Sequence, residues 1–276
     1  MEGFSGKVAV VTGAGSGIGR ALAVELARSG AKIAISDIDN EGLAETERQI
    51  KSLGGDVRSD RLNVAEREAF LLYADAIKDH FGTVNQIYNN AGIDFHGELE
   101  ASEFKDIERI IDVDFWGVVN GTKAFLPHLI ASGDGHVVNV SSIFGVMACP
   151  GQSSYNAAKF AVRGFTESLR QEMIIGKKPV AVTCVHPGGI KTNVARNATV
   201  AEGYDHAEFT KLFDMLARTR PQAAARIILT AVRKKKPRVL VGPDAKAIDI
   251  LVRLTGARYQ DLFVLGERFL MPKRSH

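Results

Sequence analysis

Two patterns of apolar and polar positions alternate along the chain. The first run, "KVAVVT" at 7–12, is short, β-branched and apolar, which fits a strand buried on both faces of a parallel sheet. The next run, "IGRALAVELARS" at 18–29, carries apolar residues at helical spacing and stops before Gly30, a residue type that often ends helices. The chain therefore opens with a strand and then a helix.

The same alternation continues to residue 241. Further strands are predicted at 32–36, 57–62, 86–89, 136–140, 180–185 and 238–241. Further helices are predicted at 41–53, 66–81, 103–131, 154–175 and 221–233, and 193–216 is expected to be a loop. Strands that alternate with helices of about ten residues or more indicate βαβ units. We predict an α/β fold, a single doubly wound Rossmann-type domain whose parallel sheet of about seven strands has helices on both faces.

The alternation ends near residue 242, and 276 − 242 = 34 residues follow. We assign 1–242 to the Rossmann-type domain and 243–276 to a C-terminal amphipathic helical extension of the same domain. Two amphipathic stretches, 245–255 and 258–270, have apolar faces that must be covered. They are expected to pack on a neighbouring subunit, to cover a substrate pocket, or to lie on a membrane surface.

Composition narrows the class of protein. The 276 residues are 45% hydrophobic, enough for a sizeable core, and the net charge of +3 is too small to indicate a nucleic-acid partner. The two cysteines, Cys149 and Cys184, lack metal-ligand spacing, and no metal site is expected. The N-terminus does not resemble a signal peptide, and no window is apolar enough for a transmembrane segment. We therefore expect a cytoplasmic protein.

The stretch "TGAGSGIG" at 12–19 lies between the first predicted strand and helix. Glycines allow close backbone approach to a ligand, and the N–H groups and dipole of the following helix attract a pyrophosphate. A tight turn alone would also need glycine, but the strand–turn–helix context favours a dinucleotide. The loop residues expected at the cofactor are Gly13, Ser16, Gly17, Ile18 and Gly19.

The second strand ends at Asp37, whose carboxylate is suited to bind ribose hydroxyls and to repel a 2′-phosphate. Neither Ser16 nor Ile38 offers a positive charge for that phosphate, and Arg20 belongs to the first turn of the helix. The predicted cofactor is therefore NAD rather than NADP.

Tyr155 and Lys159 lie four residues apart at the head of a predicted helix. The pair alone has two interpretations. It is either ordinary helix surface or a phenol whose ionisation is promoted by an adjacent ammonium.

The order of several motifs decides between them. The chain carries "TGAGSGIG", "NNAG" (89–92), Ser142 in "NVSS", the Tyr155–Lys159 pair and "PGGIKT" (187–192), each at a strand end or helix start. From about Gly6 to Gly242 it resembles the short-chain dehydrogenase/reductase family. The resemblance implies that Tyr155 is the general acid/base, that Lys159 lies beside it and the nicotinamide ribose, and that Ser142 holds the substrate oxygen. A cation at roughly 4 Å is worth up to about 4 kcal/mol, or about three pKa units, to the phenolate.

The resemblance also assigns cofactor contacts. Asn63 and Val64 are expected beside the adenine, although the family usually has Asp where this chain has Asn63. The remaining expected contacts are Asn90, Ala91 and Gly92 over the cofactor, and Pro187, Gly188, Ile190 and Thr192 on the nicotinamide side.

Asp114 stands where the family often carries Asn at the far end of a proton relay. Either the residue takes part in such a relay through its backbone carbonyl, or it marks a helix kink where its side chain bonds local backbone. The sequence leaves both interpretations open.

The expected function is NAD-dependent interconversion of an alcohol and a ketone or aldehyde, with a small, apolar substrate. Reduction of a β-ketoacyl or other lipid-derived carbonyl is the alternative within enzymology, and a non-catalytic dinucleotide-binding regulator is the alternative outside it. The family resemblance further implies a homodimer or homotetramer that pairs helices 103–131 and 154–175.

Overall fold

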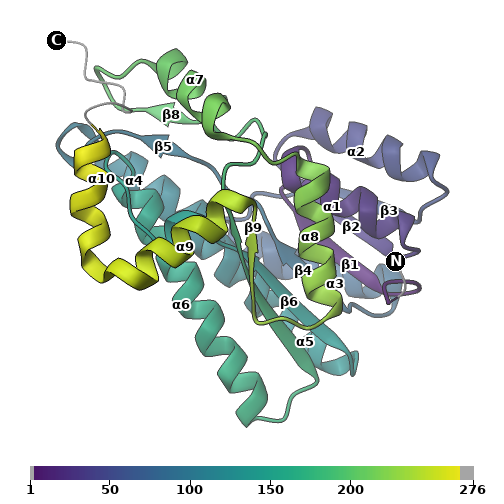
Figure 1. The fold of residues 1–276 in the computed structure, drawn as a ribbon. Coiled ribbons are helices and arrows are strands. Elements are labelled where there is room, and N and C mark those ends of the chain that lie inside the picture. The colour runs from purple at the N-terminus through teal and green to yellow at the C-terminus, as the bar shows by residue number, and fades with distance from the viewer. Residues whose placement is uncertain (1–2, 268–276) are drawn as a thin grey trace.

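The computed structural model describes residues 3–267, and a parallel sheet forms its centre (Figure 1). The seven strands are β1 (Val8–Thr12), β2 (Lys32–Asp37), β3 (Val57–Arg61), β4 (Gln86–Asn89), β6 (Gly135–Val140), β7 (Val180–Pro187) and β9 (Arg238–Val241). Their spatial order is β3-β2-β1-β4-β6-β7-β9, and every neighbouring pair is parallel. The predicted fold class is confirmed.

Helices cover both faces of the sheet. The α-helices are α1 (Gly17–Arg28), α2 (Asn40–Ser52), α3 (Arg67–Phe81), α4 (Phe104–Ile111), α5 (Gly117–Ala131), α6 (Ser153–Ile175), α7 (His206–Leu216), α8 (Pro221–Arg233), α9 (Pro243–Thr255) and α10 (Tyr259–Glu267). The core on one face joins the sheet to α1, α2 and α8, and the core on the other joins it to α3, α5 and α6 (Figure 1). Within β1, Ala9 and Val11 belong to the first core while Val8 and Val10 belong to the second, which explains why this strand is apolar throughout.

The strand order places a crevice beside β1. The chain builds outward from β1 through β2 to β3, then crosses back to β4 on the other side of β1. In open α/β sheets, ligands bind where the strand order reverses in this way, outside the carboxyl ends of the strands. The loops after β1 and β4 therefore define the position of the site.

Two sequence-based expectations about local structure were wrong. The long helix at 103–131 is interrupted by a π-helical segment, Asp112–Trp116, which separates α4 from α5. The segment 193–216 is not a loop throughout, because it contains α7 and the short strand β8 (Thr199–Val200). The latter pairs in parallel with an unpredicted strand, β5 (Phe95–His96).

The C-terminal extension is anchored to the sheet by charge. Asp249 of α9 accepts a hydrogen bond from Arg238 of β9 at 2.7 Å and another from Arg253 of its own helix at 2.9 Å. The second predicted stretch, 258–270, corresponds to α10, although its residues 268–270 lie outside the described part of the chain. The apolar side chains that the extension leaves exposed are Ile250, Leu251, Leu254, Leu262, Val264 and Leu265.

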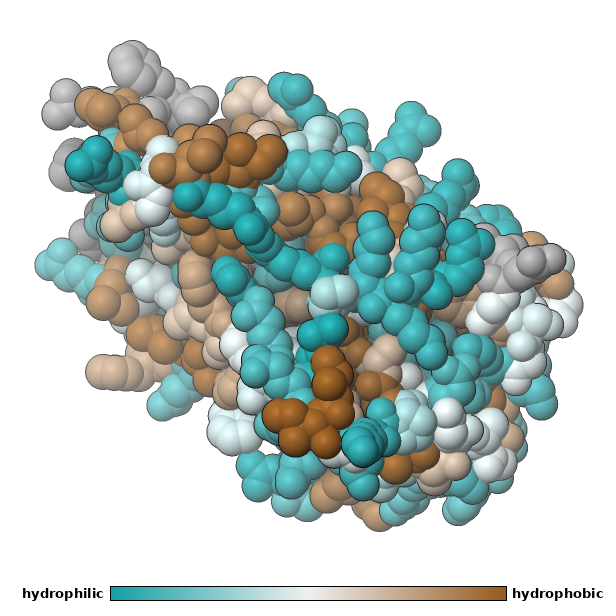
Figure 2. Space-filling model, turned by 60° about the horizontal axis from the view of Figure 1, so that its bottom comes forward, coloured by the Kyte–Doolittle hydropathy of each residue, from teal (hydrophilic) through white to brown (hydrophobic). Residues whose placement is uncertain are grey.

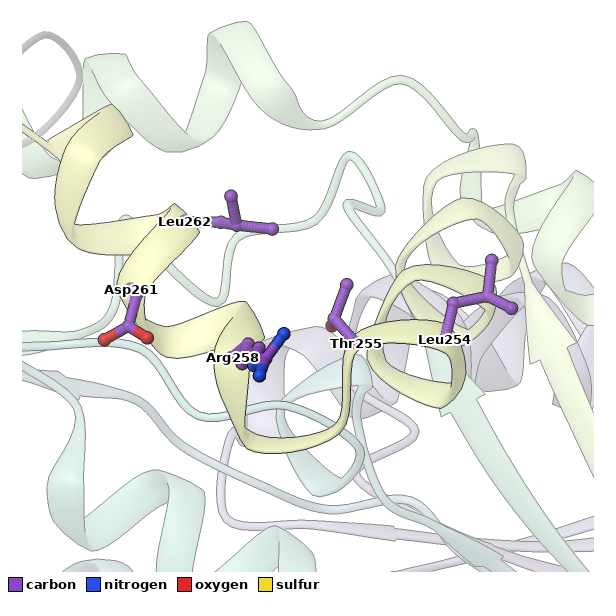
Figure 3. A pocket seen from close by; sticks show the side chains of 5 residues that line it. All are labelled: Leu254, Thr255, Arg258, Asp261 and Leu262. Atoms are coloured by element: carbon purple, nitrogen blue, oxygen red, sulfur yellow. The ribbon is translucent and has the colours of Figure 1, made fainter.

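Within residues 3–267, no helix combines the length and the apolar character that a transmembrane segment requires. On the face shown in Figure 2, apolar side chains form separate patches divided by hydrophilic ones. A hollow in the extension is lined by Leu254, Thr255, Arg258, Asp261 and Leu262 (Figure 3). None of these five residues belongs to the motifs that predicted the chemistry.

Candidate active site

The glycine loop after β1 packs too closely against two other loops to admit side chains at Gly13 and Gly17. Gly13 has φ +64°, and a Cβ on it would lie 2.7 Å from Cα of Ala91, in the loop after β4. Gly17 has φ +54°, and a Cβ there would lie 3.0 Å from Cγ2 of Thr192, in the loop after β7. Two other loops thus meet the glycine loop near the N-terminus of α1, whose first N–H groups lack intrahelical acceptors. These donors fit a pyrophosphate.

Asp37 lies beside the glycine loop at the end of β2. Its Oδ2 accepts a hydrogen bond of 2.8 Å from the N–H of Gly15, and its Oδ1 accepts one of 3.1 Å from the N–H of Asp39. The carboxylate thereby holds the glycine loop and remains partly exposed toward the crevice side of the sheet. Ile38 beside it is 57% exposed and uncharged.

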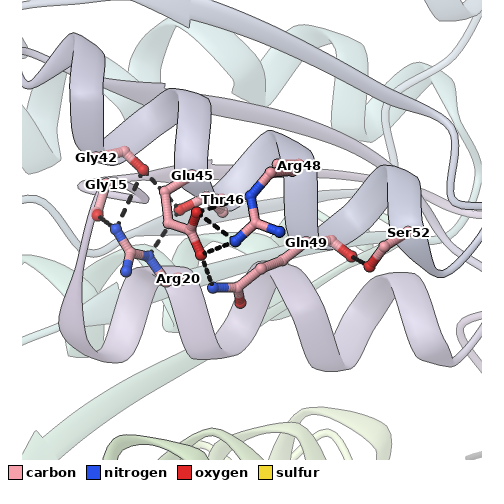
Figure 4. Close-up of polar contacts among 8 residues, drawn as sticks. All are labelled: Gly15, Arg20, Gly42, Glu45, Thr46, Arg48, Gln49 and Ser52. Carbon is pink, nitrogen blue, oxygen red and sulfur yellow. Dashed lines mark hydrogen bonds and ion pairs between the residues drawn. The ribbon is translucent and has the colours of Figure 1, made fainter.

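Arg20 is engaged by backbone and hydroxyl oxygens rather than being available to a phosphate. Its guanidinium donates to the carbonyl of Gly15, to the carbonyl of Gly42 at 3.2 Å and to the hydroxyl of Thr46 at 2.9 Å (Figure 4). Nearby, Glu45 pairs with Arg48 along the exposed side of α2. Arg20 therefore braces the glycine loop against α2, and Asp37 is the charged side chain at the end of β2.

Asn90 fastens the loop after β4 to β1. Its side-chain amide donates to the carbonyls of Thr12 at 3.0 Å and Gly13 at 3.2 Å. The N–H groups of Asn90 and Ala91 both donate to the hydroxyl of Thr12, at 3.0 and 3.1 Å. Gly92 lies close to the candidate residues Asp114 and Lys159, since a Cβ on it would lie 3.2 Å from Oδ2 of Asp114 and 3.3 Å from Nζ of Lys159.

The two residues expected at the adenine have different surroundings. Asn63 makes local contacts, since its amide donates to Glu66 at 3.0 Å and its oxygen accepts the N–H of Ala65 at 3.2 Å. Val64 is buried, and its carbonyl accepts a hydrogen bond of 3.0 Å from Asn120 of α5. Both lie directly after β3, on the same edge of the sheet as Asp37.

The loop after β7 holds the remaining expected contacts. Pro187 is the last residue of that strand, and the N–H of Gly188 bonds to Val241 at 2.9 Å. The side chain of Ile190 belongs to the buried core, so a cofactor contact by this residue would come from its backbone. Thr192 packs its methyl group against the glycine loop at Gly17.

Ser142, Tyr155 and Lys159 converge beyond the end of β6. The hydroxyl of Ser142 accepts the N–H of Phe144 at 3.1 Å, which fixes the turn after the strand. The ring of Phe144 meets that of Tyr155 edge-on at 6.2 Å. One helical turn further along α6, Nζ of Lys159 lies 5.4 Å from the centroid of the Tyr155 ring.

Asp114 is brought to Lys159 by the π-helical segment. One carboxylate oxygen lies 2.8 Å from Nζ of Lys159, and the other accepts the N–H of Ile93 at 2.8 Å. The Asp114 side chain is fully buried. Burial raises the pKa of Asp114, while the ammonium of Lys159 and the N–H of Ile93 oppose that rise. Its carboxylate thus faces Lys159, rather than bonding only local backbone within the helix.

The balance of charges around Tyr155 differs from the one expected for a lone Tyr–Lys pair. Burial raises the pKa of Tyr155, the carboxyls of Asp94 and Asp114 raise it further, and a hydrogen bond with Ser142 opposes the rise. The ammonium of Lys159 is already paired with Asp114, which weakens its effect on the phenol. In the protein without a bound cofactor, the pKa of Tyr155 therefore lies well above its ordinary value.

Three residues near the site were not singled out for it by the sequence analysis. Asp94 and Gln152 form a buried hydrogen-bonded pair beside Tyr155. His186 places Nδ1 2.9 Å from the carbonyl of Ser142, and since a carbonyl only accepts, this nitrogen carries the proton. Burial lowers the pKa of His186 to about 4, so the ring is neutral and braces Ser142. The sequence signal that could have identified these three residues was their position next to "NNAG", Tyr155 and "PGG".

The C-terminal extension also touches the loops of the site. Ala245 and Ile248 of α9 pack in one cluster with Ile143, directly after Ser142. The hydroxyl of Tyr259 accepts the N–H of Ala148 at 3.0 Å.

A second contact reaches the loop after β7. Asp244, at the start of α9, accepts the N–H of Gly189 at 2.6 Å. The extension therefore braces two loops, the one after β6 and the one after β7.

Comparison with known proteins is consistent with this arrangement. The family described as short chain dehydrogenase matches residues 7–203. SadH of Mycobacterium tuberculosis (strain ATCC 25618 / H37Rv), classed as an oxidoreductase, is 64% identical over 273 residues, which cover 99% of each chain. Cyclohexanol dehydrogenase of Acinetobacter sp. (strain SE19) is 35% identical over 228 residues, which cover 82% of this chain and 87% of that protein.

A solved structure extends the likeness over the whole fold. The short chain dehydrogenase/reductase from Burkholderia phymatum, crystallised in complex with NAD, superposes with a TM-score of 0.86 at 28% identity, with 100% of both chains covered.

Proposed function

The chain belongs to the short-chain dehydrogenase/reductase family of oxidoreductases, and we propose that it interconverts an alcohol and a ketone or aldehyde with NAD(H). The observation that carries this proposal is the convergence of Ser142, Tyr155 and Lys159 at the end of the glycine-lined crevice. The substrate is a small molecule with a largely apolar skeleton, since Ile93, Phe95 and Ala201 share a cluster with Tyr155.

The residues around the crevice fit NAD. The glycine loop at Gly13 and Gly17 binds the pyrophosphate, and Asp37 binds the adenosine ribose. NADP is disfavoured, because Asp37 repels a 2′-phosphate and Arg20 is engaged elsewhere. When bound, NAD⁺ accepts a hydride at its nicotinamide ring and carries a positive charge into the site. The NAD complex of the Burkholderia phymatum protein supports the assignment.

Tyr155 moves the proton. In alcohol oxidation the phenolate takes the proton of the substrate hydroxyl while the carbon gives up its hydride, so that a carbonyl remains. In carbonyl reduction the phenol returns the proton to the oxygen. Ser142, which shares a hydrogen bond with Tyr155, donates to the substrate oxygen and steadies its developing negative charge.

Lys159 and Asp114 set the electrostatics of that proton transfer. The ammonium favours the phenolate, and the paired carboxylate moderates this effect at a distance of 2.8 Å from Nζ. Because Asp114 also holds the N–H of Ile93, it fixes the lysine relative to the loop after β4.

A panel of alcohols tests the proposal. Primary, secondary and cyclic alcohols, cyclohexanol included, are offered with NAD or NADP, and NADH or NADPH formation is followed by absorbance. We expect turnover with NAD, loss of most turnover in Tyr155→Phe, and retained NADH binding in that variant by fluorescence titration. Tyr73→Phe, a buried tyrosine of α3, is the matched control.

Two results contradict the proposal. Near-normal turnover by Tyr155→Phe removes the general acid/base. NAD binding without oxidation or reduction of any alcohol or carbonyl in the panel favours the non-catalytic regulator.

A further inference from the structure

A buried carboxylate and a buried amide flank the reacting residues. Asp94 follows the loop after β4 and is 7% exposed, and Gln152 precedes α6 and is 4% exposed. The amide nitrogen of Gln152 donates to Oδ1 of Asp94 at 3.0 Å, and the N–H of Phe95 donates to the same oxygen at 2.8 Å. The pair therefore joins the β5 segment to the start of the helix that carries Tyr155.

The pair lies within electrostatic range of Tyr155. Residues on both sides of Asp94, namely Ile93 and Phe95, pack in one apolar cluster with Tyr155. Burial raises the pKa of Asp94 to about 7, against the hydrogen bonds from Gln152 and Phe95. Asp94 in turn raises the pKa of Tyr155. The carboxyl group of Asp94 and the phenol of Tyr155 therefore lie in the same poorly solvated region.

One buried acceptor atom of the pair has no hydrogen-bond partner among the described residues. This atom is Oε1 of Gln152. The hydrogen bonds from Gln152 and Phe95 both fall on Oδ1 of Asp94. An unpaired buried acceptor costs about 1–3 kcal/mol, so native proteins rarely leave one without a purpose or a bound partner. A molecule that brings a hydrogen-bond donor would relieve this cost.

We propose that Asp94 and Gln152 form a subsite for a second hydrogen-bond donor of the substrate, so that the preferred substrate is a neutral diol or hydroxyketone rather than a simple alcohol. The inference rests on the proposed function, because Tyr155 must act on the other oxygen. The apolar cluster around Ile93, Phe95 and Tyr155 takes the carbon skeleton. Carboxylate-bearing hydroxy acids bind poorly, because Asp94 and Asp114 both disfavour an anion there.

A purely structural role for the pair makes a different prediction. If Gln152 only held α6 to the β5 segment, its loss would lower the efficiency for all substrates in the same proportion. A subsite instead changes the ratio between substrates that carry the second donor and those that do not.

Matched substrate pairs separate these roles. Cyclohexanol is compared with the cyclohexane-1,2-, 1,3- and 1,4-diols, and linear alcohols with the corresponding diols, at saturating NAD. In the unmodified enzyme we expect kcat/KM for the best diol to exceed that for its mono-alcohol by about tenfold or more, a difference of about 1.4 kcal/mol. In Gln152→Met, which keeps the volume but removes the acceptor, this ratio falls toward one.

Asp94→Asn is the second variant and keeps the shape of the side chain. We expect it to lower the diol preference and to raise the relative efficiency with hydroxy acids. Gln86→Met replaces a buried glutamine that bonds to Tyr88 in β4, and it is expected to keep the ratio of the unmodified enzyme.

Each outcome bears on the subsite. Equal efficiency for diols and mono-alcohols in the unmodified enzyme overturns the subsite alone, and so does an unchanged ratio in Gln152→Met. Turnover of neither class overturns the proposed function, and the subsite with it. A ratio that falls in Gln152→Met and Asp94→Asn but not in Gln86→Met supports the assignment.

Discussion

Asp114→Asn gives a direct test of the electrostatics around Tyr155. The asparagine keeps an oxygen for the N–H of Ile93 but removes the negative charge that lies 2.8 Å from Nζ of Lys159. The lysine then acts on the phenol without a paired carboxylate. Asp112, an exposed carboxylate on the same π-helical segment, supplies the matched control Asp112→Asn.

The size of the effect follows from the distance between the lysine and the phenol. Nζ of Lys159 lies 5.4 Å from the centroid of the Tyr155 ring. With an effective dielectric constant of about 20, a unit charge at this distance is worth about 3 kcal/mol, or about two pKa units. If Asp114 cancels about half of that effect, its neutralisation lowers the pKa of Tyr155 by about one unit.

The assay is the pH dependence of kcat/KM for alcohol oxidation. Oxidation requires the phenolate, so activity rises as pH rises through the pKa of Tyr155. Removal of a nearby negative charge favours the phenolate, so the rising limb moves to lower pH in Asp114→Asn and stays in place in Asp112→Asn. A limb that does not move, or that moves to higher pH, refutes the electrostatic role of Asp114.

Three further predictions concern the cofactor, the extension and assembly. Asp37→Ala combined with Ile38→Arg is expected to raise the kcat/KM ratio of NADP to NAD at least tenfold, about 1.4 kcal/mol; an unmodified enzyme that prefers NADP contradicts the role of Asp37. Deletion of 245–276 is expected to raise KM for the substrate, since Ala148 loses its partner from α10; unchanged kinetics contradict the bracing contacts. Light scattering is expected to report a dimer or tetramer that Phe160→Glu, at a half-exposed position on α6, weakens; a monomer at micromolar concentration contradicts this.

The central sheet was predictable because burial on both faces leaves an unmistakable pattern. Strands such as β4 and β9 were predicted with their observed bounds, since short apolar runs between helical segments have few other interpretations. The two-residue strands β5 and β8 were missed, because two residues carry no periodicity. Helix α7 was also missed. Its only local signal was the N-cap residue Asp205, whose side chain accepts the N–H groups of Ala207 and Glu208.

The site was predictable as a set of motifs but not as an electrostatic environment. Family motifs named Tyr155 and Lys159, while the ion pair between Lys159 and Asp114 spans 159 − 114 = 45 residues and depends on the π-helical segment. Sequence spacing gives no measure of desolvation, which is the largest influence on the pKa of Tyr155. Asp94 and Gln152 were overlooked for the same reason, since their significance lies in burial and in the unpaired acceptor of Gln152.

The contacts of the C-terminal extension have a consequence for how the enzyme is made. Residues 244–259 hold the backbone N–H groups of Ala148 and Gly189, yet they follow the last strand of the sheet in the order of synthesis. Domains generally fold as units during synthesis. A chain that has emerged from the ribosome only through β9 has every strand of the central sheet but lacks its bracing helices. The loops after β6 and β7 therefore gain these contacts only when α9 and α10 have also emerged. A released chain that is truncated near residue 242 is expected to form the sheet but to lack the full activity.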